Sequence, residues 1–82
     1  MELYKEVGQT MRLLRHQKRF TRKNVADYLG VTPATYTRYE SGQSKIPLRI
    51  VKSLAIFYDT NMDYIVGLTN ESAPLKRDES TD

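Results

Sequence analysis

The sequence predicts an all-α fold, a compact domain of five helices followed by a disordered polar tail. Three features of the 82 residues support this fold class. Apolar residues recur at steps of three and four, which is the spacing of one face of a helix. Glycine and proline stand where one helix would end and the next begin. No segment has the alternation of apolar and polar residues that is typical of a half-buried strand.

The first predicted helix spans about residues 2–18. Its apolar stripe would face the core of the domain. The residues of this stripe are Leu3, Val7, Met11 and Leu14. Gly8 weakens the helix by about 1 kcal/mol relative to alanine, and it would allow another helix to approach closely.

Two short helices, about residues 22–29 and 33–40, are predicted to meet at a tight turn. Gly30 follows the apolar run of the first, and glycine enters the left-handed conformation without the steric cost of a Cβ atom. Thr32 suits the N-cap of the second helix, and Pro33 suits its first position. These features indicate a helix-turn-helix. An ordinary helix pair in a small bundle, with no role in DNA binding, remains the alternative.

Two more helices and a tail complete the predicted fold. A fourth helix over about residues 47–58 is apolar on more than one face, so it is either central to the core or partly used in an interface. A short last helix over residues 62–66 is expected to be capped by Asn61. The domain would therefore span residues 1–68. Residues 69–82 are polar and charged, and we expect them to be disordered.

The charge of the chain, +3 in total, is unevenly distributed. Residues 1–52 carry eleven Lys or Arg and four acidic residues, whereas residues 53–82 carry two basic and six acidic residues. The basic half contains the predicted helix-turn-helix. A concentrated basic face is typical of proteins that bind nucleic acid. A solvated basic face would give the same pattern, so the charge alone does not decide.

The composition argues against several classes of function. The chain has no cysteine, and therefore neither a disulfide framework nor a thiolate metal site. Its N-terminus lacks the apolar run of a signal peptide, and no stretch approaches the length of a membrane span. We therefore expect a cytoplasmic protein that does not bind membranes. His16, the only histidine, has no nearby acid cluster with which to form a catalytic or metal site, so we expect no enzymatic activity, no metal and no cofactor.

Four motifs support a more specific interpretation. They are R-L-L-R before the predicted helix pair, V-A-D-Y-L-G-V-T within it, Y-T-R-Y-E-S-G at its end, and N-M-D-Y-I-V-G-L-T near the end of the domain. With these motifs, residues 7–69 resemble the helix-turn-helix DNA-binding domains of the lambda-repressor/Cro type, the XRE family. The resemblance implies five helices, of which the second and third read DNA. It also implies an ion pair between Arg15 and Glu40 that joins the first helix to the third. A phosphate contact or a solvent-facing charge remains the alternative for Arg15.

Four positions depart from the pattern of this family. Arg19 stands where many members have glycine, so it must either take a costly left-handed conformation or change the turn. Arg22 replaces a glutamine that commonly touches a phosphate, and arginine can make that contact with a full charge. Tyr36 replaces Ile or Val, and its hydroxyl will need a partner. Asp59 replaces a frequent glycine, which leaves the turn before the last helix undetermined.

In a fold of this family the third helix lies in the major groove and presents its N-terminal residues to the base edges. The residues expected to contact bases are Pro33, Ala34, Thr37 and Arg38, of which Thr37 can bond either a base or a phosphate. Arg38 is the best candidate for a sequence-specific contact, because its planar guanidinium can bond guanine O6 and N7 together. Phosphate contacts are expected from both ends of the helix pair, from Arg22, Lys23, Thr35, Gln43, Ser44, Lys45 and Arg49.

The expected partner is a double-stranded DNA operator. A single module contacts few base pairs, so we expect a homodimer on two half-sites. Its interface would involve Phe57, Met62, Ile65 and Leu68, unless these residues simply complete the core of a monomer. Repression by occupancy of a promoter is favoured over activation. The competing function is a protein-interaction module on the same fold, such as an antitoxin or an anti-regulator. The basic, threonine-rich surface expected at residues 33–45 favours DNA.

Overall fold

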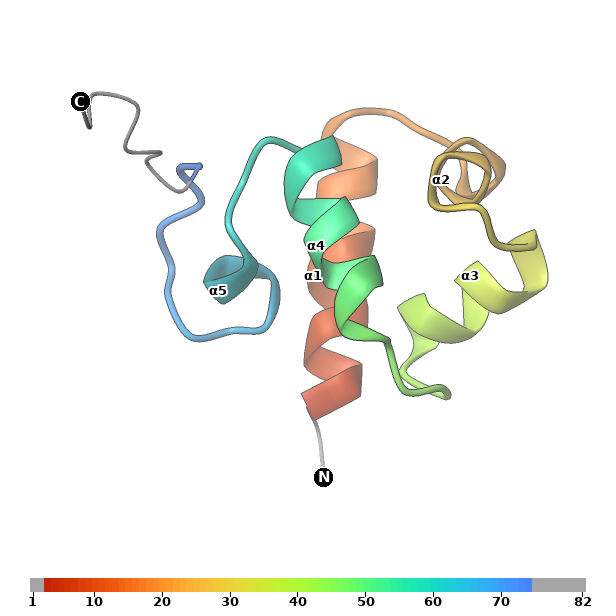
Figure 1. Ribbon diagram of the computed structural model, residues 1–82, viewed down its shortest axis with the longest axis horizontal. Coiled ribbons are helices and arrows are strands. Elements are labelled where there is room, and N and C mark those ends of the chain that lie inside the picture. Colours follow the sequence, from red (N-terminus) through yellow and green to blue (C-terminus); the bar gives the residue numbers. More distant parts are fainter. Residues whose placement is uncertain (1–2, 75–82) are drawn as a thin grey trace.

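The computed structural model describes residues 3–74, and within them it contains five α-helices (Figure 1). The helices are α1 (Leu3–Gln17), α2 (Arg22–Leu29), α3 (Pro33–Ser41), α4 (Leu48–Phe57) and α5 (Met62–Ile65). In Figure 1, α2 and α3 lie on one side of α1 and α4, and α5 lies on the other. α1 packs against α3 and α5, α2 packs against α3 and α4, and α4 packs against α5. The all-α fold class is thereby confirmed. Across residues 3–74, no helix is both long enough and apolar enough to cross a bilayer.

The turn between α2 and α3 has the local chemistry that the sequence predicts. The Thr21 hydroxyl accepts a hydrogen bond from Asn24 N, and Thr21 N donates one to the Asn24 side-chain oxygen Oδ1, so α2 begins with a capping box. Gly30 ends α2 in the left-handed conformation, with φ 75°. Thr32 caps α3 by accepting from Thr35 N, and Pro33 occupies the first turn. Only three residues therefore separate the two helices, which fixes their relative orientation.

The core is formed by apolar residues from α1 to α5. They are Val7, Met11, Leu14, Val25, Ala26, Leu29, Tyr36, Tyr39, Ile46, Ile50, Val51, Leu54, Ala55, Tyr58 and Ile65. Gly8 explains how α1 comes so close to α3. A Cβ atom at Gly8 would lie only 2.6 Å from Tyr39 O and still closer to Glu40 O. Any larger residue would therefore push α3 away from α1.

Two of the positions that depart from the family pattern are strained. Arg19, between α1 and α2, has φ 60°, and Asp59, between α4 and α5, has φ 54°. Both thus take the left-handed conformation that glycine adopts at no steric cost. The chain keeps both turns and accepts the strain, rather than changing their geometry.

The segment that follows α5 differs from the predicted tail. Thr60 donates from its hydroxyl to Ser72 O at 2.6 Å. The Asn61 amide donates to Glu71 O at 2.9 Å and to Ala73 O at 2.6 Å. Residues 71–73 are therefore attached to the two residues before α5, because the Thr60 and Asn61 side chains donate to their carbonyl groups. The remainder of the predicted tail, residues 75–82, lies outside the described residues.

Candidate nucleic-acid interface

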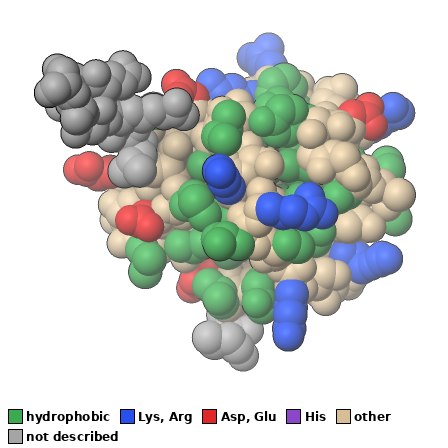
Figure 2. Space-filling model, viewed as in Figure 1, with side chains coloured by type: hydrophobic (Ala, Val, Ile, Leu, Met, Phe, Trp, Pro, Cys, Tyr) green, Lys and Arg blue, Asp and Glu red, His purple; other side chains and the backbone are tan. Residues whose placement is uncertain are grey.

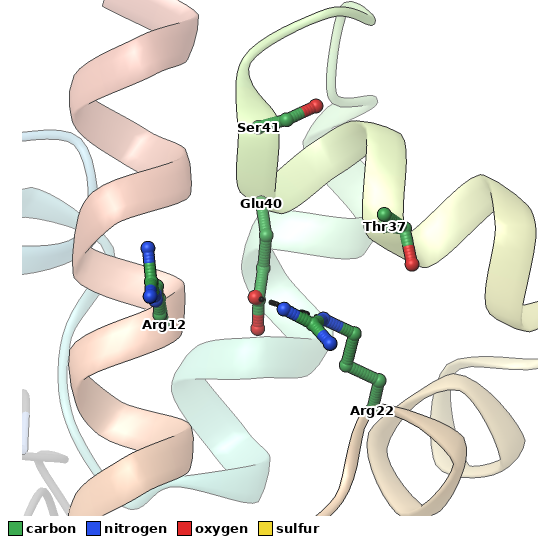
Figure 3. A pocket seen from close by; sticks show the side chains of 5 residues that line it. All are labelled: Arg12, Arg22, Thr37, Glu40 and Ser41. Atoms are coloured by element: carbon green, nitrogen blue, oxygen red, sulfur yellow. Dashed lines mark ion pairs between the residues drawn. The ribbon is translucent and has the colours of Figure 1, made fainter.

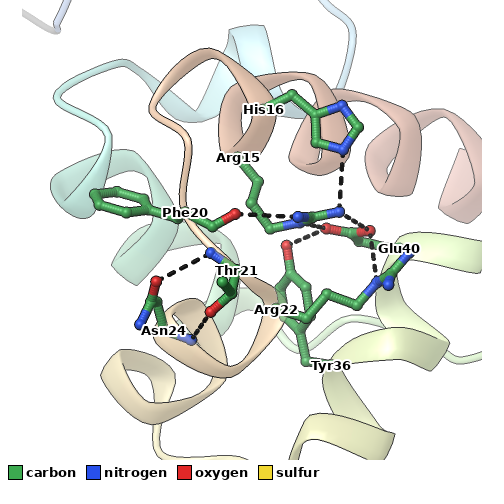
Figure 4. Close-up of polar contacts among 8 residues, drawn as sticks. All are labelled: Arg15, His16, Phe20, Thr21, Arg22, Asn24, Tyr36 and Glu40. Carbon is green, nitrogen blue, oxygen red and sulfur yellow. Dashed lines mark hydrogen bonds and ion pairs between the residues drawn. The ribbon is translucent and has the colours of Figure 1, made fainter.

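A buried ion pair joins α1 to α3 behind the helix-turn-helix (Figure 4). Arg15 Nε donates to Glu40 Oε2 at 2.6 Å, and Arg15 Nη2 donates to Glu40 Oε1 at 3.3 Å. The two side chains are only 8% and 4% exposed. Arg15 also donates to Phe20 O at 3.1 Å, which ties the turn before α2 to the same pair. The pair therefore positions α3 relative to both preceding helices.

Tyr36 completes the polar cluster around Glu40. Its hydroxyl donates to Glu40 Oε2 at 2.5 Å, which supplies the partner that a buried tyrosine needs. Burial favours the neutral form of Glu40, but the hydrogen bonds from Arg15 and Tyr36 outweigh burial and lower the pKa of this carboxyl. Burial and the nearby Glu40 carboxylate raise the pKa of Tyr36 well above its ordinary value. Glu40 is therefore held as a carboxylate and Tyr36 as its neutral donor.

The four candidate base-contact residues are all exposed on α3, at Pro33, Ala34, Thr37 and Arg38. Tyr36 and Tyr39 on the same helix are buried, 0% and 6% exposed. This division of α3 into a buried and an exposed face leaves the predicted reading residues free to meet a ligand.

The residues expected to contact phosphates differ in their exposure and in the partners that they already have. Gln43, Lys45 and Arg49 are exposed after α3, and Ser44 is half-buried there. At the start of α2, Lys23 pairs with Asp27 at 3.1 Å in a fully solvated arrangement. Arg22 approaches Glu40 Oε1 at 3.5 Å while half of its side chain remains exposed. The Thr35 hydroxyl, which is half-buried, already accepts a hydrogen bond from Thr32 at 3.0 Å.

One basic residue near this surface was absent from the sequence prediction. Arg12 on α1 lines a pocket of about 100 Å³ between α1, α2 and α3 (Figure 3). The other residues that line it are Arg22, Thr37, Glu40 and Ser41. Helical spacing places Arg12 one turn before Arg15, and that spacing was the available signal. Only the close crossing of α1 and α3 brings Arg12 beside Arg22.

The predicted dimer residues do not form one exposed surface. Ile65 is 0% exposed and belongs to the core of the single chain, so its side chain is not on the surface where another copy could contact it. Its burial follows from the short α5, which has one apolar face and turns it inward. Phe57 and Met62 are half-buried, whereas Leu68 is 77% exposed. Phe57 also stacks on Tyr28 with ring centroids 4.2 Å apart.

The charge asymmetry of the sequence is also visible on the folded surface. On the face drawn in Figure 2, most Lys and Arg side chains lie over the centre and the side of α2 and α3, while most acidic side chains lie on the side of α5. In the part of the chain from residue 3 to residue 74, no three His, Cys, Asp or Glu side chains are grouped so that they could hold a metal ion.

Comparison with known sequences identifies relatives that are helix-turn-helix proteins. Residues 11–65 match the family described as Helix-turn-helix. The uncharacterized HTH-type transcriptional regulator YobD of Bacillus subtilis (strain 168) is 36% identical over 66 residues, which cover 80% of this chain and 59% of YobD. The HTH-type transcriptional regulator AnsR of the same organism is 37% identical over 54 residues, which cover 66% of this chain and 47% of AnsR. The chain thus spans about half the length of these curated relatives.

Solved structures share the fold. The clp gene regulator ClgR from C. glutamicum aligns with a TM-score of 0.72 at 18% identity, over 80% of this chain and 86% of ClgR. The restriction-modification controller protein C.AhdI from Aeromonas hydrophila aligns with a TM-score of 0.70 at 24% identity, over 76% of this chain and 94% of C.AhdI. Because the family match covers the capped turn, both helices beside it and most of the core, this chain belongs to the helix-turn-helix family, as its XRE-type motifs indicate.

Proposed function

We propose that this protein is a double-stranded DNA-binding transcriptional regulator that reads the major groove with the N-terminal part of α3. One observation carries the proposal. The capped α2–α3 turn and the Arg15–Glu40 pair hold α3 rigidly, with its reading residues exposed and with basic residues at both ends. Such a rigid helix, flanked by phosphate-binding groups, is what major-groove recognition requires. The names of YobD and AnsR, both HTH-type transcriptional regulators, support the same proposal.

The proposed recognition of the base sequence depends mainly on Arg38. Its fork of donors can bond guanine O6 and N7, which gives about 1–3 kcal/mol of discrimination against other bases. Pro33 and Ala34 can contact a thymine methyl group but offer no side-chain hydrogen bond. Sequence-dependent DNA shape would therefore add to the specificity.

We propose repression by occupancy, with two copies bound to half-sites about 34 Å apart. Among the exposed or half-exposed apolar residues near α5, Phe57, Met62 and Leu68 are the ones we assign to a contact between copies. Because Ile65 is buried in each copy, this contact would be small unless the DNA holds both copies in place.

A protein-interaction module on this fold is the competing function. It would be favoured by a broad apolar surface along residues 33–45. In the described part of the chain, the large apolar side chains that are exposed are Leu3, Leu13, Tyr28, Leu48, Ile56 and Leu68, and none of these lies in residues 33–45. The outward surface of α3 therefore favours DNA.

Selection from a pool of randomised duplex DNA, at near-physiological salt, tests the proposal. Wild type, Arg38→Ala and the control Lys52→Ala are run in parallel, because Lys52 is an exposed cation on α4. We expect wild type and Lys52→Ala to enrich an inverted repeat with half-sites about 10 bp apart. Arg38→Ala should lose preference at one base position of each half-site. A pool without any enriched sequence, combined with binding that collapses at modest salt, would reject sequence-specific regulation.

A further inference from the structure

We propose that the pocket between α1, α2 and α3 binds one phosphate of the DNA backbone, with Arg12 and Arg22 as its charged ligands. The inference rests on the proposed function, and its new part is Arg12, because a phosphate contact by Arg22 is already expected from the helix-turn-helix pattern. The pocket has a volume of about 100 Å³ and is lined by two arginines, two hydroxyl side chains and one carboxylate. Figure 3 shows Arg12 on α1 and Arg22 at the start of α2 on opposite sides of Glu40, with Arg22 paired to its carboxylate.

The Glu40 carboxylate in this pocket does not repel an anion, because its negative charge is already balanced by Arg15. Arg15 holds Glu40 with two hydrogen bonds, and Tyr36 donates a third. If the Arg15–Glu40 pair is counted as neutral, Arg12 and Arg22 leave the pocket with two positive charges. A phosphodiester carries one negative charge, so the pocket and the ligand complement each other in sign.

Arg22 is free to exchange Glu40 for a phosphate. Its Nε lies 3.5 Å from Glu40 Oε1, beyond a normal hydrogen bond, and half of its side chain is exposed. Because half of the Arg22 side chain is exposed, water competes with the buried Glu40 for this guanidinium, and the pair contributes little to stability. When Arg22 moves to a phosphate, Glu40 keeps its hydrogen bonds to Arg15 and Tyr36. The exchange therefore leaves no buried charge without a partner.

Arg12 has a side chain with no assigned structural role. It is exposed, and within residues 3–74 it makes neither a side-chain hydrogen bond nor an ion pair. Thr37 and Ser41 lie one helical turn apart on α3 and both line the pocket, and the Ser41 hydroxyl donates to Arg38 O at 3.2 Å. A planar guanidinium and a hydroxyl donor are the groups that most often bond phosphate oxygens in protein–DNA complexes.

The pocket gives Thr37 a different role from base reading. Thr37 lines the pocket, and Figure 3 draws it on the side of Arg22, so we assign its hydroxyl to the phosphate. Such a contact would fix the depth and register of α3 without reading sequence. Thr37→Val should therefore weaken binding to all sequences by a similar factor, whereas Arg38→Ala should change which sequence is preferred.

The salt dependence of binding to a duplex of random sequence tests the pocket. The full chain is titrated as wild type, Arg12→Gln and Lys52→Gln; Lys52 is an equally exposed cation on α4, a helix that does not line the pocket. We expect Arg12→Gln to weaken binding roughly tenfold and to reduce the slope of log K against log salt by about one. Arg12→Lys should keep the slope, because it keeps the charge. Since Arg12 is exposed, thermal unfolding of Arg12→Gln should match wild type.

A duplex in which single phosphates are replaced by neutral methylphosphonates locates the contact. If the pocket holds one phosphate, one replacement on each half-site should weaken wild type strongly and Arg12→Gln less, because Arg22 still contacts that phosphate in the variant. A slope for Arg12→Gln equal to that of wild type would overturn the pocket, even if wild type selects an operator. Conversely, a reduced slope in a protein that enriches no sequence would keep the pocket and reject sequence-specific regulation. If the pocket binds inorganic phosphate at millimolar concentration but contributes nothing to binding of the duplex, its assignment to DNA is overturned.

Discussion

Arg15 Nε lies 2.6 Å from Glu40 Oε2, and this one contact joins the helix that opens the fold to the helix proposed to read DNA. Both side chains are more than nine-tenths buried. The pair therefore sets the orientation of α3 at the expense of desolvating two charges. Such pairs contribute specificity of geometry more than stability, because a buried pair recovers its desolvation penalty only with good geometry.

Removal of one member of this pair should be costly. Arg15→Met leaves the Glu40 carboxylate buried with only Tyr36 and the half-exposed Arg22 as partners, and we expect the free energy of unfolding to fall by roughly 3–5 kcal/mol. Urea unfolding followed by circular dichroism measures the loss. Asp27→Asn is the matched control, because it removes the exposed Lys23–Asp27 pair and should cost less than about 0.5 kcal/mol. Equal effects of the two substitutions would mean that the buried pair has no special role.

The pH dependence of stability should reveal Glu40. Burial raises the pKa of its carboxyl, but hydrogen bonds from Arg15 and Tyr36 lower it more, so the folded pKa lies below the ordinary value of 4.5. A group with a lowered folded pKa contributes stability above its unfolded pKa and loses it as the pH falls through the folded pKa. The free energy of unfolding of wild type should therefore decrease as the pH falls from about 4.5, more steeply than that of Glu40→Gln. Parallel curves for the two proteins below this pH would contradict the assignment.

Replacement of a buried tyrosine by phenylalanine should change the free energy of unfolding in opposite directions at Tyr58 and Tyr36. Tyr58 is 4% exposed, and its hydroxyl has no hydrogen-bond partner in the described structure, whereas the Tyr36 hydroxyl donates to Glu40. Tyr58→Phe removes an unsatisfied buried group and should raise the free energy of unfolding by about 1 kcal/mol. Tyr36→Phe removes a hydrogen bond to a charged acceptor and should lower it by about 1.5–3 kcal/mol. Chemical denaturation of both variants at neutral pH measures the two changes. A lower free energy of unfolding for Tyr58→Phe would indicate a water that bridges the Tyr58 hydroxyl to another group.

Alkaline pH gives an independent test of Tyr58. Burial raises the pKa of Tyr58 to about 12. A tyrosine with a raised folded pKa contributes its full stability below the unfolded pKa and loses it as the pH rises through the folded value. Between about pH 10 and 12, wild type should therefore lose more stability than Tyr58→Phe, as equilibrium unfolding in this range would show. The same rate of loss in both proteins would place the Tyr58 hydroxyl in contact with solvent.

Local signals predicted most of the fold, because they act within a few residues. The spacing of Val25, Ala26 and Leu29 and the residues Gly30 to Pro33 were enough to place the turn, and the structure has each of these residues in the expected conformation. The positions that could not be predicted depend on contacts between distant segments. Thr60 and Asn61 hold residues 71–73 through backbone carbonyls, which every residue has and no composition reveals.

In the candidate site, too, some features could be predicted from local spacing and others depend on contacts between distant segments. Exposure of the α3 residues followed from helical spacing, because Tyr36 and Tyr39 occupy the buried face. The pocket was missed because Arg12 and Arg22 are brought together only by the close approach of α1 and α3 at Gly8. Likewise, the apolar residues of the short α5 could not be divided into buried and exposed ones until α4 and α1 were in place against it.

The two strained turns provide the last prediction. Arg19 at φ 60° has a long side chain in a conformation that costs an ordinary residue roughly 1–2 kcal/mol. Asp59 at φ 54° is a residue type that tolerates this conformation better. Glycine relieves the strain but adds up to about 1 kcal/mol of backbone entropy to the unfolded chain. Arg19→Gly should therefore raise the free energy of unfolding by about 0.5–1 kcal/mol, and Asp59→Gly should change it by less than about 0.5 kcal/mol. Thermal unfolding of the two variants beside wild type gives the order, and a larger gain for Asp59→Gly would show that local hydrogen bonding, rather than the steric strain of the side chain, controls these turns.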